Sequence, residues 1–147
     1  MSDFKIREYT ESDLDQILKF KEQSAKISFP EQKIKTEKFK KILEKKLEKH
    51  EDCIKILEVK SKVAGYIQMS IKKTIVGDYG IIDNVFVKGE YRRAGIGKKM
   101  MEEAEKYFKK KKIDKMRVKV TLTNIASLNL CKKLGFEEKR LILEKKI

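Results

Sequence analysis

The sequence is poor in the residues that build cross-linked, metal-bound or membrane-embedded proteins. Its 147 residues include no tryptophan, one proline, one histidine and two cysteines. Cys53 and Cys131 cannot make a disulfide framework, so we interpret both as reduced thiols. With a single histidine they form no ligand cluster, and we expect no metal site. No apolar run reaches the roughly 18 residues of a membrane-spanning helix, so we expect no membrane partner.

The charge of the chain is strongly one-sided. Lysine and arginine number 37 against 23 aspartates and glutamates, which gives a formal net charge of +14. Such an excess attracts nucleic acid, anionic membrane surfaces or phosphate-rich cofactors. Lysine is nevertheless spread over nearly every segment, which favours a well-solvated surface. The first residues show no apolar stretch of the signal-peptide type, so we expect a cytoplasmic protein.

The apolar periodicity predicts one α/β domain of the α+β type over residues 1–147. Alternating positions indicate strands, and positions three or four apart indicate helices. The expected strands are 3–9, 53–60, 63–72, 81–87, 116–122 and a last one around Leu141 and Leu143; the expected helices are 11–25, 36–50, 96–112 and 125–133. The order is therefore β-α-α-β-β-β-α-β-α-β, with a mixed, mainly antiparallel central sheet flanked by helices.

A glycine-bearing loop between a strand and a helix is the most informative segment. Gly95 and Gly97 stand where this loop becomes the long helix, and glycine lets a ligand approach backbone N–H groups closely. The helix N-terminus supplies free donors and partial positive charge, and Arg92, Arg93 and Lys98 add full charges. Together these features predict a pyrophosphate cradle. The spacing fits neither a P-loop nor the dinucleotide-binding fingerprint.

Two motifs carry a resemblance to a known family. Arg92-x-x-Gly95-x-Gly97 resembles the acyl-CoA-binding motif of the GNAT superfamily of N-acetyltransferases. The segment from Asn124 to Phe136 resembles a second signature of the family, N-x-x-A-x-x-L-Y-x-K-x-G-F. The resemblance covers most of the chain. It implies acetyl-CoA as co-substrate and direct transfer of its acetyl group to an amine.

The resemblance also implies which residues hold acetyl-CoA. The pyrophosphate would lie on the backbone from Arg93 to Lys98, and the pantetheine arm would pair with the strand from Val85 to Val87. The adenosine end would lie near the short helix of residues 125–133. The cofactor-binding residues implied are Val85, Phe86, Val87, Arg92, Arg93, Ala94, Gly95, Ile96, Gly97, Lys98, Asn124, Asn129 and Lys132.

Asp83 and Cys131 are the candidate catalytic residues. Asp83 resembles an acidic position of some family members, such as polyamine acetyltransferases, and would act as a base directly or through water. A structural, hydrogen-bonded aspartate is the alternative, and Tyr79 and Glu90 are weaker rivals. Cys131 replaces the tyrosine that acts as general acid in the family. We favour packing for this thiol over a role as acid or as covalent acyl carrier.

The predicted function is transfer of an acetyl group to a primary amine of a small molecule, a peptide or a protein N-terminus. A cationic polyamine is disfavoured by the net charge, unless Glu8, Glu11, Asp13 and Asp15 form a local acidic pocket. The first alternative is a non-catalytic CoA-binding regulatory module, which the Cys131 departure favours. A basic nucleic-acid-binding module is the least favoured. The sequence leaves a homodimer open.

Overall fold

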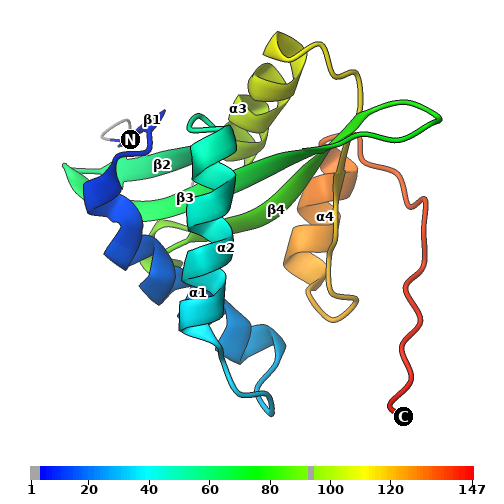
Figure 1. Ribbon diagram of the computed structural model, residues 1–147, viewed down its shortest axis with the longest axis horizontal. Coiled ribbons are helices and arrows are strands. Elements are labelled where there is room, and N and C mark those ends of the chain that lie inside the picture. The colour runs from blue at the N-terminus through cyan, green and yellow to red at the C-terminus, as the bar shows by residue number, and fades with distance from the viewer. Residues whose placement is uncertain (1–3, 93–94) are drawn as a thin grey trace.

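The computed structural model describes residues 4–92 and 95–147, and its elements follow the predicted order up to the last strand (Figure 1). The elements are β1 (Phe4–Glu8), α1 (Leu14–Ser28), α2 (Thr36–Lys49), β2 (Ile54–Val59), β3 (Lys62–Lys72), β4 (Tyr79–Val87), α3 (Ile96–Lys110), β5 (Met116–Val118) and α4 (Ile125–Lys133). Two short 3-10 turns, Glu11–Asp13 and Gly89–Tyr91, precede α1 and follow β4.

The five strands form one sheet in the order β1-β2-β3-β4-β5. The first four strands pair antiparallel, and β5 alone runs parallel to its neighbour β4. The helices cover both faces. Leu43 of α2 and Ile17 of α1 pack with β2 and β3 on one face, and Met100 of α3 and Cys131 of α4 pack on the other. The predicted class, a mixed and mainly antiparallel sheet flanked by helices, is confirmed.

The predicted last strand is absent. Residues 137–147 belong to no strand, and Leu141 and Leu143 are 73% and 85% exposed. The expected strand 116–122 is also shorter, because β5 ends at Val118. Alternation of apolar residues shows which side chains would share a face, but a strand exists only where a neighbour offers backbone partners. Because β5 has only three residues, it offers the tail a very short edge.

The turn between β2 and β3 is built from two residues that seldom adopt its backbone conformation. Val59 and Lys62 pair across it, and Lys60 and Ser61 between them have φ values of 50° and 66°. Positive φ at both central positions is the requirement of a type I′ turn, for which Asn-Gly is the preferred pair. Lysine and serine therefore occupy this turn at a conformational cost.

A bulge in β4 determines how its side chains are divided between the two faces of the sheet. Gln68 of β3 pairs with Asn84 and Met69 pairs with Ile82, so Asp83 is an extra residue without a partner on β3. Before the bulge, Ile82 packs on the α3 face. After it, Phe86 packs with α1, and Val87 takes the α3 face. Even-numbered residues thus change faces at Asp83.

Candidate active site

The strands β4 and β5 separate halfway along β4. Their backbone pairing covers only Gly80 to Ile82, matched with Met116 to Val118, whereas β4 continues to Val87. Within the described residues, the β5-facing edge of β4 from Asp83 onward therefore has no strand beside it. Val85 on this stretch is 39% exposed. An extended segment of a ligand can add to such an edge through main-chain hydrogen bonds.

Asp83 lies where the two strands begin to separate. Its carboxylate accepts a hydrogen bond from the hydroxyl of Ser70 and forms an ion pair with Lys46 of α2, with 3.3 Å between Nζ and Oδ2. Lys46 also donates to the Ser70 hydroxyl at 3.0 Å. The Asp83 side chain keeps 21% of its surface exposed. The carboxylate is thus held by two donors and still accessible, which suits a group that exchanges a proton with a substrate.

A second polar chain continues from the bulge into the interior. Lys21 of α1 donates to Oδ1 of Asn84 at 2.6 Å, and Nδ2 of Asn84 donates to Oε1 of Gln68 at 2.9 Å. Gln68 is 2% exposed, so its amide is held in place by the surrounding core. Burial lowers the pKa of Lys21, and the nearby charge of Asp83 opposes that shift in part. Asn84 therefore has a fixed orientation beside Asp83.

The N-terminus of α3 is shaped for an anion. Gly95 precedes the helix at φ 75°, a left-handed conformation in which glycine is unstrained. None of the described side chains caps this end, and the first turn contains no acidic residue. No described side chain therefore accepts a capping hydrogen bond from the N–H groups of the first turn. Lys98, in the same turn, is exposed. Free donors, the helix dipole and this lysine are the features that a phosphate-binding helix end requires.

The structure shows a role for Gly97 in helix packing, whereas its motif suggests a contact with a ligand. A Cβ placed there would lie 3.0 Å from Cδ2 of Leu130 on α4. The glycine therefore permits close packing of α3 against α4, in addition to any approach by a ligand. Ile96 is buried, so only its backbone can reach a ligand. Arg93 and Ala94 of the predicted cradle lie outside the described residues.

Arg92 ties the end of β4 to the loop that follows. Its Nε donates to the carbonyl oxygen of Val87 at 2.8 Å, and its guanidinium lies 5.8 Å from the centre of the Phe86 ring. Phe86 in turn stacks on Phe20 of α1 at 4.6 Å between ring centres and is 8% exposed. Phe86 can therefore face a ligand mainly through its backbone, whereas Val85 also presents a side chain.

The remaining residues predicted to bind the cofactor lie on α4 or at its N-terminal cap. The side chain of Asn124 accepts a hydrogen bond from the backbone of Ser127 at 3.2 Å and so caps the helix. Asn129 is exposed. Lys132 is also exposed and forms an ion pair with Glu138 at 2.8 Å. Of these three, Asn124 has a clear structural role, which its position in the sequence motif did not reveal.

Cys131 lies in the core between α4 and α3 and is 5% exposed. Burial raises the pKa of its thiol. The guanidinium carbon of Arg117 lies 3.8 Å from the centre of the Tyr79 ring. Glu90 is exposed, and its Oε1 lies 3.8 Å from Nζ of Lys88. Of the rival candidates for proton transfer, Asp83 is the one that lies at the separation of β4 and β5.

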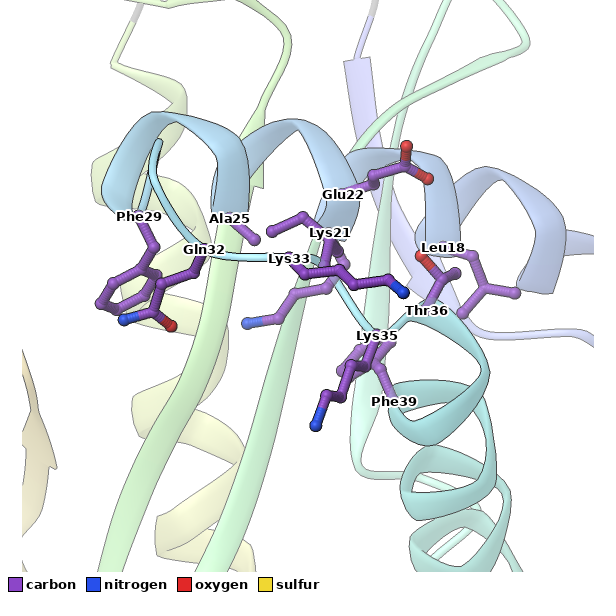
Figure 2. Close-up of a pocket in the computed structure, with 11 residues that line it drawn as sticks. Leu18, Lys21, Glu22, Ala25, Phe29, Gln32, Lys33, Lys35, Thr36 and Phe39 are labelled. Carbon is purple, nitrogen blue, oxygen red and sulfur yellow. The ribbon is translucent and has the colours of Figure 1, made fainter.

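Two cavities flank this region on the side of α1. One, of about 350 Å³, lies between α1 and the start of α2 and is lined by Lys21, Lys33, Lys35 and Phe39 among others (Figure 2). The other, of about 450 Å³, lies between the end of α1 and the loop after β4, with Phe86 and Arg92 in its wall. Lys21 therefore belongs both to the first cavity and to the polar chain at the bulge.

Sequence reasoning missed Lys21, Lys46, Gln68 and Ser70. Gln68 and Ser70 had a signal, because they are polar residues at alternate positions of an otherwise apolar strand. Lys21 and Lys46 had none, since each stands in a helix rich in lysine. Within the part of the chain that the structure describes, no cluster of metal-binding side chains occurs and no helix is both long and apolar enough to cross a membrane.

Comparisons with known proteins agree on one family. The sequence model of the acetyltransferase (GNAT) family matches residues 15–136. An N-alpha-acetyltransferase of Sulfurisphaera tokodaii is 26% identical over 150 residues, which cover 95% of this chain and 84% of that protein. A possible acetyltransferase from Clostridium difficile 630 has a similar structure, with a TM-score of 0.77 and 26% identity over 98% of this chain and 97% of that one.

A further solved structure, a predicted acetyltransferase with acetyl-CoA from Clostridium acetobutylicum, gives a TM-score of 0.79. The superposition covers 97% of this chain and 96% of that one. At 18% identity this likeness shows the fold alone.

Proposed function

The chain belongs to the GNAT family of acetyltransferases, an acetyl-CoA-dependent class, and we propose that its acceptor is the α-amino group of a peptide or protein N-terminus. The β4 edge that β5 leaves free, from the Asp83 bulge toward the loop before α3, supports the acetyl-CoA part of this function. The similarity to an N-alpha-acetyltransferase over most of both chains supports this acceptor class.

Bound acetyl-CoA would supply a thioester, whose acetyl group passes to the amine while CoA leaves as a thiolate that water protonates. In this chain, the free N–H groups at the start of α3 and the charge of Lys98 bind the pyrophosphate. The backbone of Val85 to Val87 holds the pantetheine arm as an added strand. A free backbone amide near Val87 is a donor for the negative charge that develops on the thioester oxygen.

Asp83 is the proposed proton acceptor. The amine must lose a proton to attack, and the carboxylate of Asp83 lies where the bound thioester would meet it. Asp83 would hold this proton only in passage and give it to water. Ser70 and Lys46 keep the carboxylate oriented. Cys131 packs in the core and takes no part in proton transfer.

An acetylation assay tests the proposal. The protein is incubated with acetyl-CoA and a set of peptides with free or blocked N-termini, and mass spectrometry locates the added acetyl group. We expect modification of the free α-amine and none of the blocked peptides. Acetylation of small amines or lysine side chains alone would contradict the acceptor class. CoA binding without turnover of any amine would instead support the regulatory module.

A further inference from the structure

The cavity between α1 and α2 has the character of a binding site for a negatively charged group. We propose that it binds a carboxylate that the acceptor carries close to its reactive amine. This inference rests on the proposed function, because the ligand is the acceptor of the acetyl group. The chemical class is a peptide with an acidic side chain next to its N-terminal residue.

Lys21 is the first support. Its ammonium group is half-buried and donates to a neutral amide oxygen, Oδ1 of Asn84. Among residues 4–92 and 95–147, no carboxylate lies within the 4.0 Å of an ion pair with it. A buried charge is costly unless it is paired, and an amide oxygen compensates it only in part. An anionic ligand in the cavity would complete its pairing.

The charge of the rest of the wall is the second support. Figure 2 shows Lys21, Lys33 and Lys35 gathered on the side of α1 that faces the start of α2. Lys33 and Lys35 are exposed and come from the segment that joins the two helices. Glu22, the acidic residue of the wall, is engaged by Lys26 at 3.2 Å. The charge available to a ligand is therefore positive.

The apolar part of the wall adds a preference of shape. Leu18, Phe29 and Phe39 line the cavity, and the ammonium group of Lys21 lies 5.5 Å from the centre of the Phe39 ring. Apolar walls with a few charged groups are typical of sites for small ligands or short chain segments. The carboxylate would thus come with an aliphatic stem that packs on these rings.

Asn84 connects the cavity with the proposed proton acceptor, Asp83. Lys21 holds this side chain, and Asn84 follows Asp83 directly at the β4 bulge. A ligand whose carboxylate reaches Lys21 therefore has its amine near the proposed proton acceptor. Two of the four acids that could have attracted a cationic acceptor are engaged elsewhere, since Asp13 is held by Arg7 and Glu8 by Lys55.

The test compares three peptides that differ only at the second residue, which is Glu, Gln or Lys. For the unaltered protein we expect a KM for the Glu peptide about tenfold lower than for the Gln peptide, as a charge-assisted hydrogen bond would give. Lys21→Gln should abolish the preference, and Lys21→Arg should restore part of it. Lys33→Glu and Lys35→Glu should each weaken it by roughly two- to fivefold.

Lys45→Glu is the control matched to Lys33→Glu and Lys35→Glu, because it changes the net charge by the same amount. Lys45 lies on α2 at an exposed position outside the cavity wall. This variant should leave the preference intact. An equal loss in this control would assign the preference to the overall charge and overturn the inference. So would equal KM values for the three peptides in the unaltered protein, even with efficient acetylation.

A binding measurement separates this inference from the proposed function. Calorimetry with the CoA-loaded protein compares peptides bearing Glu or Gln at the second residue, independently of turnover. Tighter binding of the Glu peptide that is lost in Lys21→Gln supports the cavity assignment even if another amine is the true acceptor. Equal binding of the two peptides overturns it, whereas failure of peptide acetylation alone counts against the proposed function.

Discussion

Asp83 combines an unpaired backbone position with a carboxylate held by Ser70 and Lys46. If it accepts the proton of the amine, Asp83→Ala should lower kcat by roughly 10²–10⁴-fold, the usual contribution of general acid–base catalysis. CoA affinity, measured by calorimetry, should remain, because the proposed cofactor contacts lie further along the β4 backbone. Ser70→Ala is the control for orientation and should cost less. Full activity of Asp83→Ala would show that water alone removes the proton.

The two cysteines should make stability depend on alkaline pH. Burial raises the pKa of the Cys53 thiol from 9.0 to about 11, and burial also raises the pKa of Cys131. The unfolded chain loses these protons first as pH rises, so the contribution to the free energy of unfolding is full below about pH 9 and declines toward pH 11. Urea titrations across this range should show the decline, and Cys53→Ala should flatten it.

Cys131→Ala should change kcat little, because the thiol packs in the core. A loss of activity in a folded Cys131→Ala protein that still binds CoA would make this thiol catalytic and contradict the assignment.

The β2–β3 turn is the element in which sequence and backbone agree least. Each non-glycine residue in the left-handed region costs on the order of 1–2 kcal/mol, and asparagine and glycine bear it better. The double change Lys60→Asn with Ser61→Gly should therefore raise the free energy of unfolding by about 1 kcal/mol. Urea unfolding measures the change. Lower stability would show that the lysine or serine side chain makes a compensating interaction.

A charge reversal at the start of α3 should weaken ligand binding while it raises stability. Lys98→Glu places an acid in the first turn, which favours the helix by roughly 0.3–1 kcal/mol through its dipole. The same change repels pyrophosphate, and we expect the Kd of CoA to rise about tenfold. Thermal unfolding and calorimetry measure the two effects. Lys110→Glu at the other end of α3 is the matched control and should leave CoA binding unchanged.

Sequence periodicity predicted individual elements better than their pairing. The predicted strand 63–72 agrees with β3 within one residue, because its mainly apolar residues are buried on both faces of the sheet. The strand expected around Leu141 was wrong, since the same alternation there lacks a partner strand. For the proposed site, neighbouring residues alone were enough to nominate Asp83 and the glycine loop. Lys46 and Ser70 were not assigned, because their contacts with Asp83 join segments far apart in sequence and depend on the bulge.

For the whole molecule, the exposed tail is the feature most relevant to behaviour in solution. Leu141, Ile142 and Leu143 are 73%, 66% and 85% exposed, and β5 ends the sheet with an open edge. Exposed apolar residues near an open edge favour association between chains. We predict concentration-dependent formation of a homodimer, measured by sedimentation velocity. Leu141→Lys with Leu143→Lys should shift the protein to the monomer, and a monomer at all concentrations would contradict the prediction.

The extra residue in β4 also bears on how this gene can change. Without Asp83, Ile82 and Asn84 would be neighbours opposite Met69 and Gln68, so the strand would pair regularly and Phe86 and Val87 would keep their faces. A one-residue deletion at this point would therefore spare both cores and remove only the carboxylate. Related genes that have lost this codon should encode proteins that fold and present the same edge without the proposed proton acceptor.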